Sequence, residues 1–302
     1  MESSRWRERL MFSITPPRES TSPEDAQRIA EVIIERLRSL DLDALIVYDI
    51  DDESDRNPDE RPFPYLPTQD PADFHTRHLG GWDRPVVVYR CVGKVSPTDL
   101  KAWLATQDPE HVRTVFVGAS SSSKQVLTDL RQAQDLWRHT RPELPMGGVA
   151  IPERHSSGGL EHERMLRKQR AGASFFVTQV VYDADAAKSM VSDYHYACLD
   201  QGQEPAPVIF TLSVCGSLKT LAFLEWLGVD VPRWMHIELE RSDDPLSASF
   251  DHCVATAQDL ATFCRRLGMP FGFNVESVSI RRAEIDASVR LAERLGTQRQ
   301  HA

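Results

Sequence analysis

Hydrophobic residues in this chain gather in short continuous runs, separated by longer stretches in which polar and charged residues dominate. Eight such runs lie at 11–15, 44–48, 86–89, 114–117, 149–151, 174–177, 207–212 and 271–275. Strands of a parallel sheet that is covered on both faces have this continuous apolar character, whereas strands with one solvent-exposed face alternate. The pattern therefore predicts eight buried parallel strands.

Helical sequence follows each run. Ser22 to Asp25 is a helix start, with serine as the N-cap, proline at the first position and acids in the first turn. This helix is expected to run to about Leu40, with Ile29, Val32, Ile33, Leu37 and Leu40 on one apolar face. Residues 57–71 are rich in proline and are expected to form a loop that contributes to a site. Further helices are expected to span 124–139, 161–170 and 184–199. Others are expected to begin at 97, 218, 232 and 282, and one long helix is expected to end near 267.

The repeated strand–helix unit defines the fold class. Eight buried strands, each followed by helical sequence, match an α/β protein built as a single (β/α)8 TIM barrel, with residues 1–302 as one domain. No Gly-x-Gly-x-x-Gly follows any of the runs, which argues against a dinucleotide-binding Rossmann domain.

Composition and charge narrow the range of partners. The 302 residues carry a net charge of −10, so nucleic acid is not expected as a partner, because phosphate binding needs clustered Lys and Arg. No apolar run approaches the roughly 18 residues of a membrane span, and the N-terminus lacks the apolar core of a signal peptide. A cytoplasmic protein without membrane contact is therefore expected, and a homo-oligomer is left open. The five cysteines include no Cys-x-x-Cys pair, so no metal site and no disulfide framework are predicted.

Polar side chains follow the predicted strands, and in a barrel all of the strand ends converge on one face. They are Ser13, Thr15, Asp49 to Glu53, Tyr89, Arg90, Ser120, Glu153, His155, Gln179, Thr211, Ser213, Asn274 and Glu276. Several carboxylates on one rim suit general acid–base chemistry, because neighbouring charges can raise the pKa of one of them towards neutrality.

Three of these strand ends carry linked motifs. Pro152 to His155 reads Pro-Glu-x-His, the segment from Lys168 to Ala173 reads Lys-x-x-Ala-Gly-Ala, and Thr178-Gln179 is followed by Tyr182-Asp183. Together they resemble the methylenetetrahydrofolate reductase family. The Asn-Val-Glu-Ser-Val-Ser run at 274–279 resembles the last strand end of the shorter bacterial members of that family.

The resemblance implies a TIM-barrel enzyme that reduces 5,10-methylenetetrahydrofolate to 5-methyltetrahydrofolate, with NAD(P)H as the donor and with FAD or FMN left open. It implies Gln179, Thr15 and Tyr182 as substrate-binding residues, and His155, Lys168 and Glu153 as cofactor-binding residues. The amide of Gln179 offers the donor and the acceptor that a pterin edge requires. The alternatives are a solvated loop histidine at 155, an exposed helix lysine at 168 and a structural role for Gln179.

Four positions depart from the family pattern. Ser13 stands where the family has its proton-donor glutamate, and a serine hydroxyl cannot act as an acid at neutral pH. Val117-Gly118-Ala119 replaces the usual Arg-Gly-Asp, and Ile151 replaces the tyrosine that packs on the flavin. The segment 214–218 contains no aromatic residue to stack on the folate.

The proton donor is then expected elsewhere on the rim. The catalytic residues predicted are Asp49, Glu53 and Glu276, with Asp49 first because it lies nearest the barrel. The alternatives are a solvated charge run at 51–53 and a salt-bridged rim carboxylate at 276.

The sequence is interpreted as a divergent, actinobacterial-type member of the family, which transfers hydride from a nicotinamide to methylenetetrahydrofolate with or without a flavin. Two alternatives stay open, a non-redox folate-dependent one-carbon enzyme and a folate-binding protein without catalysis. In each case the expected partner is a small-molecule folate.

Overall fold

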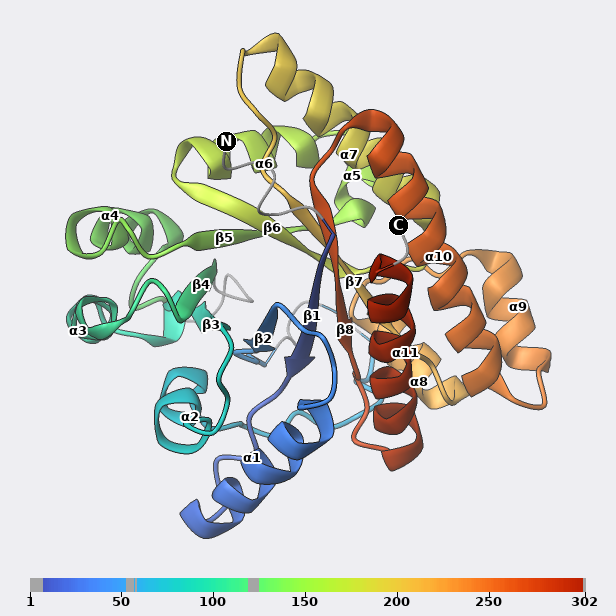
Figure 1. The fold of residues 1–302 in the computed structure, drawn as a ribbon, viewed down its shortest axis with the longest axis horizontal. Helices are drawn as coiled ribbons and strands as arrows, with labels where there is room; N and C mark the ends of the chain where they lie inside the picture. The colour runs from blue at the N-terminus through green and yellow to red at the C-terminus, as the bar shows by residue number, and fades with distance from the viewer. Residues whose placement is uncertain (1–7, 53–56, 58, 119–124, 301–302) are drawn as a thin grey trace. The chain divides into compact units, whose positions relative to one another are not determined.

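The computed structural model describes residues 8–52, 57, 59–118 and 125–300. Eight parallel strands close into a barrel in sequence order, and helices connect successive strands (Figure 1). The predicted (β/α)8 TIM barrel is therefore confirmed. The strands are β1 (Arg9–Ile14), β2 (Ala44–Val47), β3 (Val86–Cys91), β4 (Val112–Val117), β5 (Met146–Ala150), β6 (Ala173–Val180), β7 (Val208–Ser213) and β8 (Phe271–Glu276).

Helices fill the intervals between the strands. None of them, over the residues that the structure describes, is long and apolar enough to cross a lipid bilayer. They are α1 (Pro23–Leu37), α2 (Pro71–His78), the 3₁₀ helix η3 (Val92–Lys94), α3 (Pro97–Thr106), α4 (Leu130–Thr140), α5 (Pro152–Gly158), α6 (Glu161–Arg170), α7 (Ala184–Asp200), α8 (Leu218–Trp226), α9 (Arg233–Arg241), α10 (Pro245–Leu267) and α11 (Arg282–Gln300).

The chain divides into two compact parts. The C-terminal part comprises Met1–Phe12, Leu40–Leu42 and Val149–Ala302, and the N-terminal part comprises Ser13–Ser39 and Asp43–Gly148. Pairs β6–β7, β7–β8 and β8–β1 hold the strands of the C-terminal part together. Pairs β2–β3, β3–β4 and β4–β5 do so in the N-terminal part. The assignment of residues 1–302 to one domain stays a prediction.

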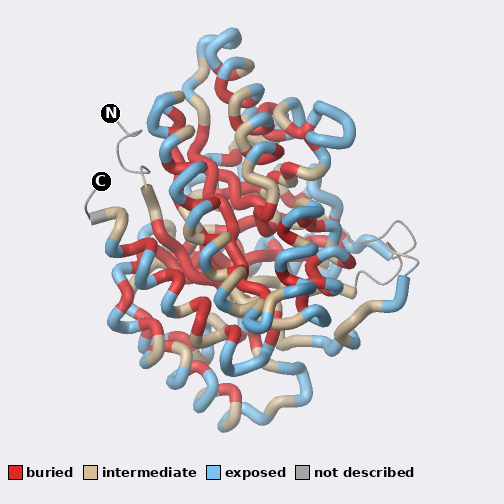
Figure 2. Tube along the Cα trace, turned by 90° about the vertical axis from the view of Figure 1, so that its right-hand side faces the viewer, coloured by how far each residue is buried: buried red, intermediate tan, exposed pale blue. Residues whose placement is uncertain are grey.

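The core follows the strands, as the continuous apolar runs predicted. Every residue of β2, β3 and β7 is buried. In the C-terminal part, Phe176, Tyr194 and Phe210 belong to one cluster that joins β6 and β7 to α7 and α10. Figure 2 shows buried residues along the strands and exposed residues on the outer turns of the helices.

The buried face of α1 differs in part from the predicted one. Val32 is 57% exposed and Ile29 is also exposed, whereas Ala26, Ala30 and Ile34 are buried. The buried residues recur at a spacing of four, so they share one face of the helix. The prediction holds for Leu37 and Leu40, which are buried, and it was wrong for Ile29 and Val32, because it followed large apolar side chains and left out the two alanines.

Two helices were missed in the sequence. α2 begins at Pro71, where the proline-rich loop was expected to end, and Asp70 caps it by accepting a hydrogen bond from Ala72 N at 2.8 Å. α5 begins at Pro152, directly after the run at 149–151, whereas the next helix was expected only at 161. Proline suits the first position of a helix because its missing N–H has no partner there, as at Pro23 in α1. Proline also begins α3 and α10, so the same signal marks five helix starts, of which those at Pro23 and Pro97 were recognised.

The helix predicted to begin at residue 124 starts at Leu130 instead. Asp129 and Gln132 form a capping box there, in which each side chain binds the backbone N–H of the other residue. Two of the predicted rim residues, Glu53 and Ser120, lie outside the described residues.

Candidate functional site

Glu153 lies in the first turn of α5, directly after β5. Its Oε1 accepts a hydrogen bond from Asp230 N at 3.4 Å, while Oε2 is buried without a hydrogen-bond partner in the part of the chain that the structure describes. Burial raises the pKa of Glu153 to about 7, and the nearby carboxylates of Asp230 and Asp183 act in the same direction. Near neutral pH this carboxyl group therefore carries a proton about half of the time, which suits a general acid.

Gln179 lies at the carboxyl end of β6 and is half-buried. Its Nε2 donates a hydrogen bond to the carbonyl oxygen of Leu227 at 3.0 Å. An amide nitrogen carries two hydrogens, so one of them remains for a ligand. Because Leu227 and Asp230 belong to the same short connection between α8 and α9, Gln179 and Glu153 are both attached to that connection.

A register irregularity in β6 accompanies the position of Gln179. The pairing with β7 shifts between Val177 and Val180, where Thr178 Oγ1 accepts a hydrogen bond from Thr211 N at 2.9 Å. Thr211 Oγ1 in turn donates to the carbonyl oxygen of Thr178 at 2.8 Å. Such irregularities re-aim side chains at the rims of barrels. Here Thr178 is buried between the strands while Gln179 is accessible.

Tyr182 lies just beyond β6 and is 1% exposed. Its hydroxyl donates a hydrogen bond to the carbonyl oxygen of Ser213 at 2.9 Å, and its ring stacks on His252 at a centroid distance of 5.2 Å. Burial raises the pKa of the Tyr182 hydroxyl well above its usual value. Tyr182 is thus a buried residue that connects the ends of β6 and β7 through this hydrogen bond. Its predicted contact with substrate stays a prediction.

Glu276 is the last residue of β8 and lies opposite Ser213 of β7 in the strand pairing. Its carbonyl oxygen accepts a hydrogen bond from Ser288 Oγ at 3.1 Å, which anchors α11 to the strand end. The predicted catalytic role of Glu276 stays a prediction. A second carboxylate, Glu284, is buried nearby and accepts hydrogen bonds from Thr220 Oγ1 at 3.1 and 3.2 Å.

The two side chains matched to flavin contacts both bind protein groups. His155 is 6% exposed, and its Nε2 lies 3.1 Å from Asp193 Oδ2. Lys168 donates through Nζ to the carbonyl oxygen of Val149 and lies 3.8 Å from the buried Glu161 Oε1. Burial lowers the pKa of Lys168. Both side chains are thus held by protein groups, and the predicted cofactor contacts of His155, Lys168 and Glu153 stay predictions.

In the N-terminal part, Asp49 follows β2 and its side chain is only 4% exposed. Oδ2 accepts a hydrogen bond from Cys91 N at 2.6 Å, and Oδ1 lies 2.5 Å from Lys94 Nζ. Burial acts to lower the pKa of Lys94, but the charge and hydrogen bond of Asp49 outweigh it and raise that pKa. Thr15, just past β1, is exposed. The catalytic role of Asp49 and the substrate contact of Thr15 stay predictions.

Two partners of these residues were missed in the sequence. Lys94 follows β3, so the rule that polar residues gather after strands could have found it. Asp230 lies in a connection between two helices, and no sequence pattern links it to Glu153. The raised pKa of Glu153 depends on burial, which only the folded structure reveals.

A cavity of about 350 Å³ lies in the C-terminal part, at the amino ends of β1 and β8 and between α10 and α11. Phe271, the first residue of β8, lines it, whereas Glu276 ends that strand. Arg265 and Arg294 also line it. The cavity is therefore at the end of the strands opposite to Gln179 and Glu276, and it contains none of the predicted site residues.

The closed barrel of eight parallel strands with connecting helices is the (β/α)8 architecture. The family model described as methylenetetrahydrofolate reductase matches residues 117–267, which is half of the chain. A solved structure from Clostridium thermocellum is 36% identical, with a TM-score of 0.85 over 98% of both chains. That structure is of an uncharacterized protein that binds two copies of 5-methyl-5,6,7,8-tetrahydrofolic acid. The chain belongs to the methylenetetrahydrofolate reductase family.

Two further solved structures are less similar. A dihydropteroate synthase from Xanthomonas albilineans is 14% identical, with a TM-score of 0.46 over 97% of this chain and 92% of that one. An oxaloacetate acetylhydrolase is 12% identical, with a TM-score of 0.44 over 94% and 80%. Neither likeness bears on function. Comparison with the curated proteins gives no match.

Proposed function

We propose that this protein binds a reduced folate beside Gln179 and reduces 5,10-methylenetetrahydrofolate to 5-methyltetrahydrofolate with NAD(P)H. The observation that carries the proposal is the placement of Gln179, half-buried at the end of β6 with one amide hydrogen committed to Leu227. The 36% identical relative that binds 5-methyltetrahydrofolic acid, the product of this reaction, supports the choice of ligand.

The reaction requires one hydride and one proton. Hydride passes from the nicotinamide to the methylene carbon, the bond between that carbon and N10 of the folate breaks, and N10 takes up the proton. The products are 5-methyltetrahydrofolate and the oxidised nicotinamide. The protein must therefore supply an acid close to the folate, and it must hold both reactants against one another while excluding water.

Glu153 is the acid that the geometry favours. It follows β5, its Oε2 is buried without a partner among the described residues, and it contacts the connection that also holds Gln179. Its pKa of about 7, raised mainly by burial, keeps a substantial protonated fraction at neutral pH. Glu153 would thus donate the proton in place of the family's glutamate, whose position is occupied by Ser13 in this chain.

The contacts of His155 and Lys168 support direct hydride transfer from the nicotinamide to the folate. Lys168 and His155 bind Val149 and Asp193 rather than facing outward as phosphate and flavin contacts. Because both side chains bind protein groups, no step of the proposed reaction passes through a flavin. The choice between NADH and NADPH is part of the test.

The test uses the full chain, stripped of any flavin, with methylenetetrahydrofolate and either reduced nicotinamide. Loss of nicotinamide absorbance together with formation of 5-methyltetrahydrofolate, identified by mass spectrometry, is the expected result. Gln179→Ala should weaken folate binding, while Gln179→Asn, which keeps the amide on a shorter side chain, should weaken it less. Tight folate binding with no turnover for either nicotinamide would remove the reductase assignment.

That last outcome is the signature of the second candidate, a folate-binding protein without catalysis. Two observations favour it as the alternative, the serine at position 13 and the binding of 5-methyltetrahydrofolic acid by the relative from Clostridium thermocellum. A non-redox one-carbon enzyme would instead consume methylenetetrahydrofolate without oxidising the nicotinamide, so the same assay separates all three.

A further inference from the structure

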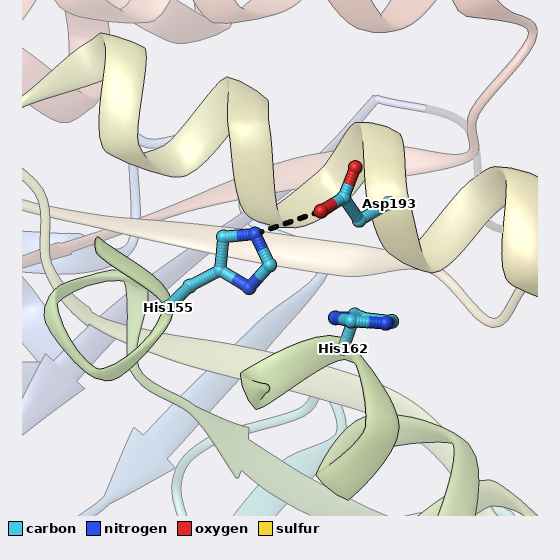
Figure 3. A group of neighbouring side chains, drawn as sticks. All are labelled: His155, His162 and Asp193. Carbon is cyan, nitrogen blue, oxygen red and sulfur yellow. Dashed lines mark hydrogen bonds and ion pairs between the residues drawn. The ribbon is translucent and has the colours of Figure 1, made fainter. Parts of the chain in front are cut away.

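Three side chains from consecutive helices meet on the helical layer of the C-terminal part. They are His155 of α5, His162 of α6 and Asp193 of α7 (Figure 3). We propose that these residues bind one divalent transition-metal ion, with zinc as the reference ion, through a nitrogen of each imidazole and the carboxylate of Asp193. The proposal departs from the absence of a metal site predicted from cysteine spacing, and it does not depend on the folate chemistry.

A tight helix-to-helix turn brings the two histidines together. α5 ends at Gly158, and Gly159 takes a left-handed conformation with a φ of 66°. Its N–H donates to the carbonyl oxygen of His155 at 2.6 Å, and α6 begins two residues later at Glu161. His162 therefore lies in the first turn of α6, where its ring meets that of His155 at a centroid distance of 5.4 Å and an angle of 79°.

The buried polar atoms at this point are not satisfied by the protein. Nδ1 of His155 and Nδ1 of His162 are both buried without a hydrogen-bond partner among residues 8–52, 57, 59–118 and 125–300. His155 itself is only 6% exposed. A buried polar nitrogen without a partner costs free energy, about 1–3 kcal/mol in general, and it calls for an explanation such as a bound ion.

The chemistry of the group matches a first-row transition metal. Imidazole nitrogens with a carboxylate oxygen form a common ligand set for zinc, and three protein ligands leave a fourth position for water. Two neutral imidazoles and one carboxylate together carry a single negative charge, which favours a divalent cation. Asp193 is exposed, so an ion can enter from solvent.

The dimensions require only a small adjustment. One ligand atom from each residue can be chosen so that all three lie within 4.8 Å of one another. Ligands around tetrahedral zinc lie roughly 3.3 Å apart, as follows from bonds of about 2.0–2.1 Å. Closing the site therefore shortens the distances between ligand atoms by at most about 1.5 Å, which the exposed Asp193 and the half-buried His162 can supply while His155 stays fixed.

Other histidine–carboxylate pairs in the protein provide matched comparisons. His236 Nδ1 lies 2.9 Å from Glu225 Oε1, and His111 Nδ1 lies 2.8 Å from Asp108 Oδ2. Neither pair has a third ligand in reach within the described parts of the chain, whereas the pair of His155 and Asp193 has His162. Simple ion pairing of a histidine is thus common here, and the second imidazole is what distinguishes this group.

The experiment is a titration of the tag-free full chain, first treated with a chelator. Zinc binding is followed by calorimetry, and cobalt is added in parallel because its visible absorption reports the coordination number. One equivalent should bind, with four-coordinate cobalt. His162→Gln and Asp193→Asn should each weaken binding by at least about 100-fold, a loss at the upper end of the range seen even for residues that support metal ligands indirectly. His236→Gln should leave it unchanged.

Folding is controlled separately. His162 and Asp193 lie towards the surface, so both variants should fold, and their melting temperatures without metal give the check. Zinc should raise the melting temperature of the unaltered protein with increasing concentration, because the ion binds the folded state, and it should not do so for either variant. Equal zinc affinity in the unaltered protein and His162→Gln, or an equal loss in His236→Gln, would overturn the proposal.

Discussion

Two carboxylates, Glu153 and Asp49, hold equivalent places in the two parts of the protein but have opposite surroundings. Each follows a buried strand and accepts a hydrogen bond from a backbone N–H. Asp49 also binds the ammonium group of Lys94, whereas Glu153 is close to two further carboxylates and has an unpartnered buried oxygen among the residues described. A cation favours the charged carboxylate, while burial near like charges favours the neutral acid. The neighbours, not the strand-end position, therefore decide which of the two can donate a proton.

The largest expected effect is on turnover. Glu153→Gln keeps the shape of the side chain but removes the acidic proton, so kcat for the proposed reduction should fall by about 10²- to 10⁴-fold. Folate affinity should change little, since Gln179 is intact. In the unaltered protein, kcat should decline as the pH rises above about 7, the pKa of Glu153. Steady-state rates over a pH series measure both the fall in kcat of Glu153→Gln and the pH dependence of kcat in the unaltered protein.

Glu240→Gln is the control for that comparison, because Glu240 is an exposed carboxylate on α9. It should leave the rate and the pH profile as they were. If Asp49→Asn removed turnover in a folded protein while Glu153→Gln did not, the assignment of roles to the two carboxylates would be reversed.

The next effect concerns stability against pH. Burial raises the pKa of Glu153 from 4.5 to about 7, so the folded state binds a proton more tightly than the unfolded state. The resulting stabilisation is complete below pH 4.5 and is lost as the pH rises to about 7. At about 1.4 kcal/mol for each pKa unit, the difference is about 3 kcal/mol. Relative to Glu153→Gln, the unaltered protein should lose this much between about pH 4 and pH 8 in urea unfolding.

The Asp49 region should respond differently, through stability alone. Asp49→Asn turns an amide N–H₂ towards either Lys94 Nζ or Cys91 N, so one donor loses its acceptor. A loss of about 2 kcal/mol in the free energy of unfolding is expected, measured from the urea midpoint. Combining Asp49→Asn with Lys94→Met should cost less than the sum of the two single changes, because the partners are coupled. Strict additivity would show that the ion pair contributes nothing.

The smallest effect concerns the backbone at the end of α5, the helix whose first turn contains Glu153. Gly159 has a φ of 66° and open space where a Cβ atom would lie, so Gly159→Ala should cost about 1 kcal/mol through backbone strain alone. Gly158→Ala is matched to it, since Gly158 lies in the helix, also in open space, and does not need a positive φ. That variant should be neutral or slightly more stable. Urea midpoints that fall equally for both would show that packing, not backbone conformation, governs the end of α5.

The sequence predicted the strands well because burial on both faces leaves a direct mark on composition. The runs that include Val86, Pro207 and Phe271 all lie in or next to observed strands. Helix starts were less secure, as Pro71 and Pro152 show, because proline can either begin or end a helix. Small residues misled the prediction for α1, where Ala26 and Ala30 form much of the buried face.

The site was predictable in outline but not in its electrostatics. Motif and strand-end position located Glu153 and Gln179, because parallel strands bring such residues to one face. The burial of one oxygen of Glu153 and the nearby Asp230 depend on how the α8–α9 connection folds back, and no local pattern encodes that. Nor did any sequence pattern indicate that His155, His162 and Asp193 lie together, since helix packing rather than spacing unites them.

The shifted pairing of β6 near Gln179 has a consequence for anyone who would transplant this rim onto another barrel. Gln179 lies where the ladder between the strands is displaced and where Thr178 and Thr211 exchange hydrogen bonds. A graft that copied Gln179 alone onto a regular strand would lack this displaced pairing, which re-aims side chains at barrel rims. A graft should therefore transfer Thr178 and Thr211, which lie on neighbouring strands, together with Gln179.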